Sequence, residues 1–412
     1  MKFRRAFWPG GLPALAGLVL AGWLAVAGGA GAAAAGEPAP AGAGGGGEPA
    51  ALTRAVEEQL RASGAERLED FYRRLAPEVR QLVPEVSLRD LVLQPGRGIR
   101  WDPGALARGV LRYFFREFFA NARLLAQVVL LAVLLAVLQS LHGAFGEEGE
   151  SVAFAACYLV LVLLGVQSFR HAAGIGSQAV QDMVSLMEAV LPLLSTLLVS
   201  GGTPATAALL SPVVYASVTG LSALMDTVVL PLLFLAVVLG LAAQLVEKFP
   251  LNRLSGLARQ ATVGVLGLAF AAFLGVMTVQ GVAGPVADGV ALRTGKFLAG
   301  TFVPVIGKMF SDAVEVVAGG ARLIKNAVGM LGIVLLAGFA FFPVLKIVSI
   351  VAVFKVAGAL VEPVADRRLP KALGHLEGSL TVLAVVVGAV GVMFFMGLTV
   401  LVQVGTLGAA LR

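Results

Sequence analysis

The feature that most constrains the fold is a series of long apolar segments separated by short polar stretches. Only 14% of the 412 residues are charged, against about 25% in soluble domains. A bilayer can cover so many apolar runs, whereas a soluble core cannot. We therefore expect an all-α, polytopic integral membrane protein with about six to nine transmembrane helices. The apolar segments lie at 124–142, 152–168, 183–200, 206–222, 227–246, 261–283, 327–345, 347–364 and 379–403.

The N-terminus has the layout of a secretory signal peptide. A basic start (MKFRR) precedes an apolar run and the small residues AAAA that end at Ala35. This order predicts a signal peptide over 1–35, and an uncleaved first transmembrane helix is the alternative. Residues 36–50, GEPAPAGAGGGGEPA, are too poor in apolar side chains to fold and are expected to form a flexible linker.

The next hundred residues are charged and then aromatic. Residues 51–105 place apolar side chains at helical spacing between mixed charges, which predicts a small helical extramembrane module. Over 106–123 arginines alternate with phenylalanines (LARGVLRYFFREFFANAR), a pattern typical of an amphipathic helix at the membrane interface. The polytopic membrane domain then covers 124–412.

Two signals for the orientation in the membrane disagree. A cleaved signal peptide would place residues 36–123 outside the cytoplasm. The arginines between 97 and 123, set against the acidic loop 143–150, favour the opposite orientation by the positive-inside rule. We favour the signal peptide, because arginines on an interfacial helix also bind lipid headgroups.

The stretch 275–317 is too rich in charge, Gly and Pro for a simple span and too apolar for a loop. Gln280 needs a hydrogen-bond partner inside its apolar run. Gly281, Gly284 and Pro285 are expected to break the helix there, and charged residues follow within a short distance. These are Asp288, Arg293 and Lys296.

A second helix is expected to start at Pro304 and to end at Gly319 and Gly320. In it Lys308, Asp312 and Glu315 share one face at 100° per residue. The segment 284–325 is thus predicted to be an amphipathic or re-entrant element. It would complete the fold at the surface, line a polar conduit, or offer a docking face to a partner.

Two acids lie within apolar sequence. Glu188 in SLMEAVLPLL and Asp226 in ALMDTVVLPLL open similar proline-containing segments. Paired broken segments with acids can form a transporter site. Solvated acids at the membrane boundary are the other interpretation.

Signatures of catalysis are missing from the sequence. GTFVPVIGKM lacks the spacing and the hydroxyl residue of a phosphate-binding loop, and the three histidines have no metal-ligand spacing. We expect no enzymatic activity, no cofactor and no metal. The single cysteine, Cys157, is interpreted as a packing residue. The basic residues form no patch with interleaved aromatics, so nucleic acid is not an expected partner.

The sequence resembles a known family over about three quarters of its length. The resemblance rests on GVMTVQGVAGPVADGVALRTGKFLAGTFVPVIGKMFSDAVEVV, on VVLPLLFLAVVL at 228–239, and on YFFREFFANARLLAQVVLLAVLLAVLQSLHGAF at 113–145. These stretches are similar, in the same order, to the stage III sporulation protein AE family of endospore-forming bacteria.

The resemblance implies a multi-pass protein of the mother-cell membrane around the forespore. It implies membership of a secretion-like channel complex between the two cells, with other stage III sporulation A-type proteins as partners, including a secretion-type ATPase and ring-forming subunits. The chain would be an export-platform or permease-like subunit without catalytic residues, and a homo-oligomer is possible. A stand-alone secondary transporter and a non-conducting scaffold are the alternatives.

Overall fold

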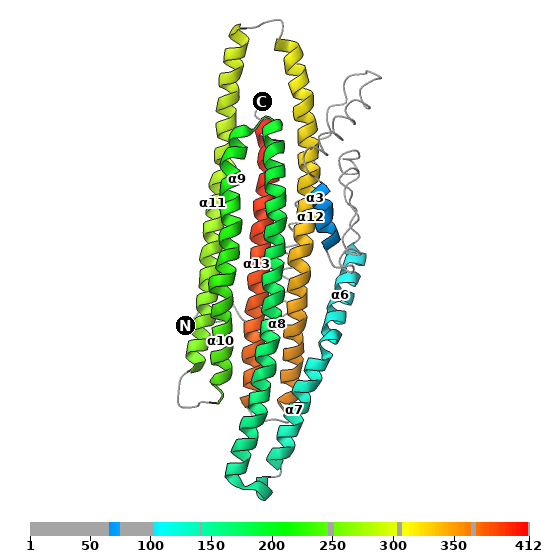
Figure 1. Cartoon of the computed structure of the whole chain (residues 1–412), viewed down its shortest axis with the longest axis vertical. Helices are drawn as coiled ribbons and strands as arrows, with labels where there is room; N and C mark the ends of the chain where they lie inside the picture. The colour runs from blue at the N-terminus through cyan, green and yellow to red at the C-terminus, as the bar shows by residue number, and fades with distance from the viewer. Residues whose placement is uncertain are drawn as a thin grey trace.

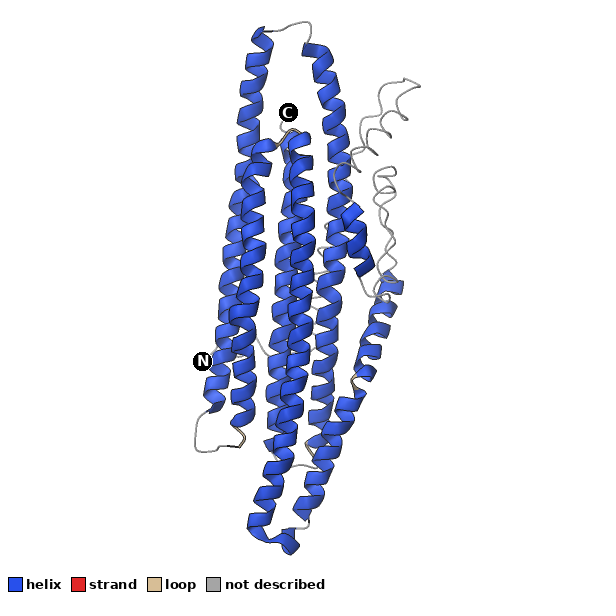
Figure 2. Cartoon of the chain, viewed as in Figure 1, coloured by secondary structure: helices blue, strands red, loops and turns tan. Residues whose placement is uncertain are grey.

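The protein is a bundle of long helices that run roughly along one axis (Figure 1). The computed structural model describes residues 66–74, 103–140, 142–245, 251–302, 307–363 and 368–410. The helices of the bundle are α3 (Glu66–Arg74), α6 (Pro103–Ala120), α7 (Ala122–Ser140), α8 (His142–Ser200), α9 (Pro204–Leu224), the π-helix η1 (Met225–Val229), α10 (Leu230–Ala242), α11 (Leu251–Phe302), α12 (Gly307–Val361) and α13 (Arg368–Ala410). The described part contains no strand, which confirms the all-α class (Figure 2).

The central element of the bundle is α13. It contacts α8, α9, α10, α11 and α12. Side chains such as Phe394, Leu398 and Met393 are fully buried at this centre, with Phe354 of α12 and Met183 of α8 against the same core. Cys157 is also buried, as expected for a packing residue. Helix α11 lies at the edge of the bundle. Of its most apolar stretch of 18 residues, 22% is buried, against 67% for the corresponding stretch of α12.

Five helices within the described residues are long and apolar enough to cross a membrane, or six if the bent pair α6–α7 forms one span. The count lies at or below the lower end of the expected six to nine, because separate apolar segments join into single helices. The segments 152–168 and 183–200 both lie in α8. The segment 206–222 and the part of 227–246 up to Ala242 lie in the continuous α9–η1–α10 stretch, and 327–345 and the part of 347–364 up to Val361 lie in α12. The polar residues between these segments do not break a helix.

The five helices are longer than a bilayer requires. They run over 36 to 46 residues, which corresponds to about 54–69 Å at 1.5 Å per residue. The hydrocarbon layer is only ~30 Å thick. Each helix therefore extends well beyond the hydrocarbon if it spans it.

Prolines within the helices are accommodated locally. Pro192, Pro212 and Pro343 lie inside α8, α9 and α12. Pro231 has no N–H for the carbonyl of Thr227, and its ring would crowd that carbonyl. The π-helix Met225–Val229 lies directly upstream, where its wider turn relieves that crowding.

The expected break at Gly281, Gly284 and Pro285 is wrong, since α11 runs without interruption from Leu251 to Phe302. A glycine inside a helix costs only about 1 kcal/mol, and here it allows close packing. A Cβ at Gly284 would lie 2.8 Å from the hydroxyl oxygen of Thr206 in α9. The glycine is thus explained by helix–helix contact.

The expected helix end at Gly319 and Gly320 is also wrong, whereas the expected start at Pro304 lies outside the described residues. Helix α12 begins at Gly307 and continues through both glycines to Val361, while 303–306 lie outside the described residues. Gly320 is buried, as is the neighbouring Ala321. The segment 284–325 is therefore the upper part of a long α11–α12 hairpin, and Figure 1 shows these two ends extending beyond the rest of the bundle.

Before residue 103 the structure describes only residues 66–74. The predicted signal peptide 1–35 and linker 36–50 lie outside the described residues, as does most of 51–105. The short helix α3 packs against α8 and α12 through Leu68 and Phe71, which are buried in the common core. The predicted helix 106–123 ends earlier, at Ala120, where α6 meets α7 at a bend of 44°.

Candidate functional site

The outward side of α8 is polar over about half of the helix. Between residues 164 and 198 no large apolar side chain of α8 is exposed, whereas Leu163 below and Val199 above are. The exposed residues are mostly three, four or seven positions apart, so they lie on one side of α8. From residue 167 to residue 196 this side is about 44 Å long. We call this set the α8 polar face: Gln167, Arg170, His171, Gly174, Gln178, Gln181, Glu188, Pro192 and Thr196.

Residues of η1 and α8 join at this face. The Ser177 hydroxyl donates a hydrogen bond of 3.0 Å to Oδ1 of Asp226, and the Gln181 amide donates to the Ser177 oxygen at 3.4 Å. One turn away, Gln178 Nε2 donates to Asp182 Oδ1 at 2.9 Å. The exposed carboxylate of Asp226 is thus held beside the α8 polar face by the π-helix.

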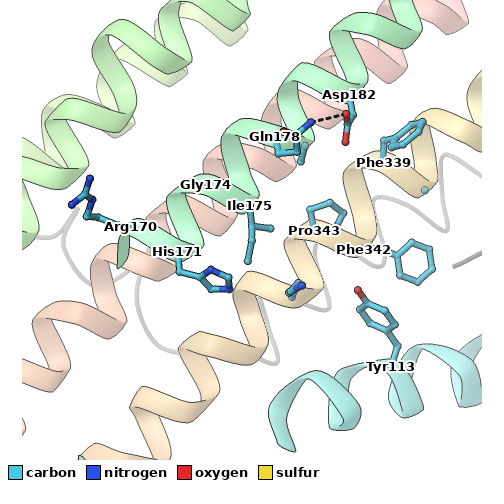
Figure 3. Close-up of a pocket in the computed structure, with 13 residues that line it drawn as sticks. Tyr113, Arg170, His171, Gly174, Ile175, Gln178, Asp182, Phe339, Phe342 and Pro343 are labelled. Carbon is cyan, nitrogen blue, oxygen red and sulfur yellow. Dashed lines mark hydrogen bonds between the residues drawn. The ribbon is translucent and has the colours of Figure 1, made fainter. Parts of the chain in front are cut away.

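A groove opens between α8, α12 and α6 next to this face. It encloses about 700 Å³. Figure 3 shows Gln178 and Asp182 across from the rings of Phe339, Phe342 and Tyr113, while the Arg170 side chain points away from them. Its lining residues are Tyr113, Arg170, His171, Gly174, Ile175, Gln178, Ala179, Asp182, Gly338, Phe339, Phe342, Pro343 and Lys346. The groove therefore combines an aromatic wall with polar groups from α8, a composition found in binding clefts.

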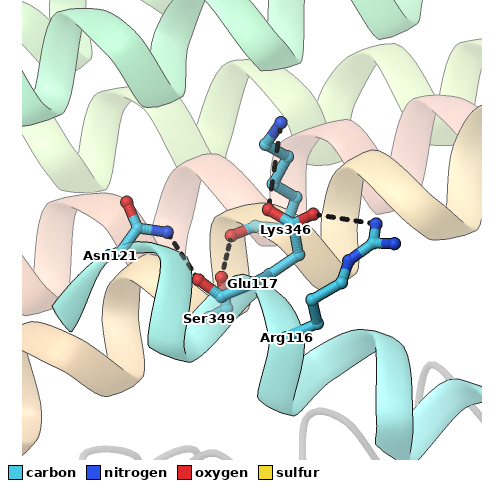
Figure 4. A network of polar contacts seen from close by, with 5 residues as sticks. All are labelled: Arg116, Glu117, Asn121, Lys346 and Ser349. Carbon is cyan, nitrogen blue, oxygen red and sulfur yellow. Dashed lines mark hydrogen bonds and ion pairs between the residues drawn. The ribbon is translucent and has the colours of Figure 1, made fainter.

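Helix α6 closes one side of the groove through an aromatic and an ionic contact with α12. The Tyr113 ring lies edge-on to Phe342 with centroids 5.2 Å apart. Glu117 bridges Arg116 of its own helix (3.4 Å) and Lys346 of α12 (3.9 Å), as Figure 4 shows. The Arg116 guanidinium also lies 5.1 Å from the Tyr113 ring centroid, within range of a cation–π contact.

These contacts predict which side chain holds α6 in place. Tyr113→Ala should release α6, because it removes a ring that is 9% exposed and packed on Phe342. We expect a local cost of about 2–4 kcal/mol and faster amide hydrogen exchange over 103–120, measured by mass spectrometry. The matched variant Glu117→Gln should change exchange little, since partly exposed ion pairs contribute about 0–1 kcal/mol. Equal exchange in both variants would contradict this account.

The surface of α11 is apolar at the same height along the bundle as the α8 polar face. A Cβ at Gly332 of α12 would lie within 4 Å of both Val190 of α8 and Leu398 of α13, and a Cβ at the adjacent Gly397 would meet Phe273 of α11. At this level α11 exposes large apolar side chains, with Leu268 74% and Val279 66% exposed. The bundle therefore has a polar outer surface on α8 and an apolar outer surface on α11.

One buried and one half-buried polar side chain have structural roles. Asp288 is 1% exposed and accepts hydrogen bonds from the backbone N–H groups of Ala205 (2.9 Å) and Thr206 (3.1 Å), and from the Thr206 hydroxyl. It thus caps the N-terminus of α9 from the neighbouring helix. The Arg259 guanidinium of α11 donates to the His375 carbonyl (3.2 Å) and the Ser379 hydroxyl (3.1 Å) of α13.

The residues predicted for a conduit or docking site are spread along the hairpin. Gln280 is half-buried on α11 and Asp288 is buried. Arg293 and Lys296 belong to the upper end of α11, and Lys308, Asp312 and Glu315 to the upper end of α12. The side chains of these five residues lie outside the described part of the chain, so their role stays a prediction.

Glu188 and Asp226, the two acids predicted to lie within the membrane, are exposed on the same side of the bundle without forming a pair. Glu188 follows Ser177, the partner of Asp226, by eleven residues, which is about 16 Å along α8. The polar groups between them, Gln178, Gln181 and Asp182, were not predicted as site residues. Their spacing of three and four residues in QSFRHAAGIGSQAVQDM is the signal that marks this side of the helix.

No group of three or more His, Cys, Asp or Glu side chains that could hold a metal is present in the part of the chain that the structure describes. The candidate site is the α8 polar face with its neighbouring groove.

Comparison with known proteins gives a consistent assignment. The sequence model of the family described as Stage III sporulation protein AE (spore_III_AE) matches residues 86–405. The chain is 33% identical over 343 residues to the Stage III sporulation protein AE of Bacillus subtilis (strain 168), a match that covers 83% of this chain and 86% of that protein. No solved structure matches the chain.

Proposed function

Because the chain belongs to the stage III sporulation protein AE family, a family of sporulation proteins, we propose that it is a membrane subunit of a channel between mother cell and forespore. In this proposal it resides in the mother-cell membrane around the forespore. It acts as an export-platform or permease-like part of a secretion-like complex. Its partners are other stage III sporulation A-type proteins, including a secretion-type ATPase and ring-forming subunits.

The observation that carries the proposal is the contrast between the polar outer surface of α8 and the apolar outer surface of α11. Helices of membrane-spanning length expose large apolar side chains on α11 and polar ones on α8 at one level. Lipid can cover the first surface, whereas the second needs water or protein. An aqueous path bounded by the α8 polar face of this subunit and by its neighbours in the complex meets that need.

The proposal is tested by the accessibility of single cysteines in sporulating cells. The variants are Gln178→Cys on the α8 polar face and Leu268→Cys on α11, each combined with Cys157→Ala. We expect a membrane-impermeant maleimide to label the first and to leave the second unlabelled, because Leu268 would face lipid. Labelling of Gln178→Cys should also reduce passage from mother cell to forespore.

Each other result favours a different function. Labelling of Gln178→Cys without any effect on passage would favour a non-conducting scaffold. Solute uptake by the purified protein in liposomes, lost on Glu188→Gln or Asp226→Asn, would favour a stand-alone transporter. Equal protection of Gln178→Cys and Leu268→Cys within the complex would contradict an aqueous path at α8.

A further inference from the structure

We infer that the outer side of α6 is a docking surface for the headgroups of anionic phospholipids. This requires a bilayer beside the bundle and is independent of the proposed channel. Basic and apolar side chains alternate on the side of α6 that faces away from the bundle, and all of them are exposed. They are Arg108, Leu111, Arg112, Phe115, Arg116 and Phe119. At 100° per residue these six positions cover about 140° of the helix, so they form one continuous side.

The other side of α6 already has a partner within the chain. The Tyr113 ring packs edge-on against Phe342, and the Glu117 carboxylate lies 3.9 Å from Lys346, both in α12 (Figures 3 and 4). The sequence predicted an amphipathic helix at the membrane interface, and the structure shows which of its two sides faces outward. The contacts of α6 with the bundle therefore leave its outer side uncovered.

Two arginines of the outer side have no acidic partner. Neither Arg108 nor Arg112 forms an ion pair within the described residues, whereas Arg116 lies 3.4 Å from Glu117. Arg123, exposed in the first turn of α7, adds a further cation close by. Helix α3, which packs on the neighbouring α8 and α12, contains three acidic and three basic residues and so adds no net charge. The uncompensated guanidinium groups favour an anionic partner, and phosphate oxygens fit their paired N–H donors.

The exposed side chains change in character along α6 and α7. Arg108 and Arg112 come first, and the Phe115 and Phe119 rings follow them towards the end of α6. Arg123 comes next, and its long side chain can extend back towards the headgroups. Beyond the bend of 44°, α7 exposes large aliphatic side chains at Leu130, Val133, Leu134 and Val137. Cations, aromatic rings and aliphatic groups are the side chains typical of the headgroup layer, the interface and the hydrocarbon, in that order.

A phospholipid fits this surface better than a soluble anion does. The Phe115 and Phe119 rings stack with centroids 6.4 Å apart and are 47% and 67% exposed. A soluble phosphate would leave this apolar area in water, whereas a lipid covers it with acyl chains while its phosphate binds the arginines. Anionic lipids add the attraction of a negative surface for basic residues within a screening length of about 8 Å.

The test measures backbone amide hydrogen exchange by mass spectrometry in the purified protein, reconstituted into nanodiscs. The discs contain either phosphatidylcholine alone or a mixture of phosphatidylcholine with phosphatidylglycerol. We expect the amides of 103–120 to exchange at least about fivefold more slowly in the mixture, because arginines bound to an anionic surface make opening of α6 rarer. Raised salt should reduce this difference between the lipids.

Three variants assign the effect to the outer side of α6. Arg108→Gln with Arg112→Gln should abolish the difference between the lipids. Arg108→Lys with Arg112→Lys should retain most of it, because the charge remains. The matched control is Arg253→Gln, which removes an exposed arginine at the start of α11 and should retain the full difference.

Three results would overturn the lipid contact. The first is equal exchange of α6 in the two lipids, which would favour an acidic protein partner on this side. The second is a difference that persists in Arg108→Gln with Arg112→Gln. The third is a difference that disappears in Arg253→Gln, because the effect would then come from the net charge of the protein. None of them bears on the proposed channel, which is decided by the accessibility of cysteines at Gln178 and Leu268.

Discussion

Asp288→Ala should strongly destabilise the protein, by about 2–4 kcal/mol. The buried carboxylate accepts the N–H groups of Ala205 and Thr206 and the Thr206 hydroxyl. Thr203, at the N-cap of α9, uses its own hydroxyl for the Leu198 carbonyl and does not cap the helix. Alanine would therefore leave the backbone N–H groups of Ala205 and Thr206 and the Thr206 hydroxyl without this acceptor.

The measurement is thermal unfolding of the purified protein in detergent, together with the protein level in sporulating cells. Asp226→Asn is the matched control, because Asp226 is exposed and its described partner is a single hydroxyl. We expect the control to change stability by less than about 1 kcal/mol. An Asp288→Ala protein as stable as Asp226→Asn would show that Asp288 does not hold α9 and α11 together.

Gly391→Ala should also destabilise the protein, although alanine is the better helix former. A Cβ at Gly391 of α13 would lie 2.6 Å from the Cβ of Ala340 in α12. Neither atom can rotate away, so α12 and α13 must move apart at the most extensive helix–helix contact among the described residues. Overpacking of this kind costs about 1–3 kcal/mol.

The matched substitution Gly275→Ala should have the opposite sign. No atom lies within 4 Å of a Cβ built at Gly275 on the exposed side of α11, so the gain in helix propensity of about 0.5–1 kcal/mol remains. The unfolding temperatures of the two variants should therefore lie on opposite sides of that of the parent protein. A shift in the same direction for both would contradict the packing of α12 against α13.

The sequence predicts the helical class and the apolar character of the bundle, because both depend on composition and local spacing. It does not predict the lengths of the helices. Gly284 and Gly320 resemble helix ends in sequence, yet both lie inside continuous helices, where Gly284 meets α9 and Gly320 is buried. A glycine that allows helix packing differs from one that ends a helix only in its contacts with other helices. For Gly284 that contact is with Thr206.

The candidate site was predicted only in part for a related reason. Glu188 and Asp226 are visible in sequence because they interrupt apolar runs, and the structure places both on the exposed side of α8 and η1. The hydrogen bond that joins Asp226 to Ser177 connects residues 49 positions apart, a distance that no local pattern encodes. Asp288, predicted for a conduit or a docking site, is buried against the N-terminus of α9, since a carboxylate and a helix N-terminus attract each other.

The central position of α13 has a mechanical consequence. Its 43 residues form one helix of about 64 Å that contacts five others. A stiff rod of this length works as a lever: a tilt of about 5° at one end moves the other end by about 6 Å. A force applied near Arg368 would therefore be felt near Gln403, and strain at either end would be shared among all the helices that touch the rod.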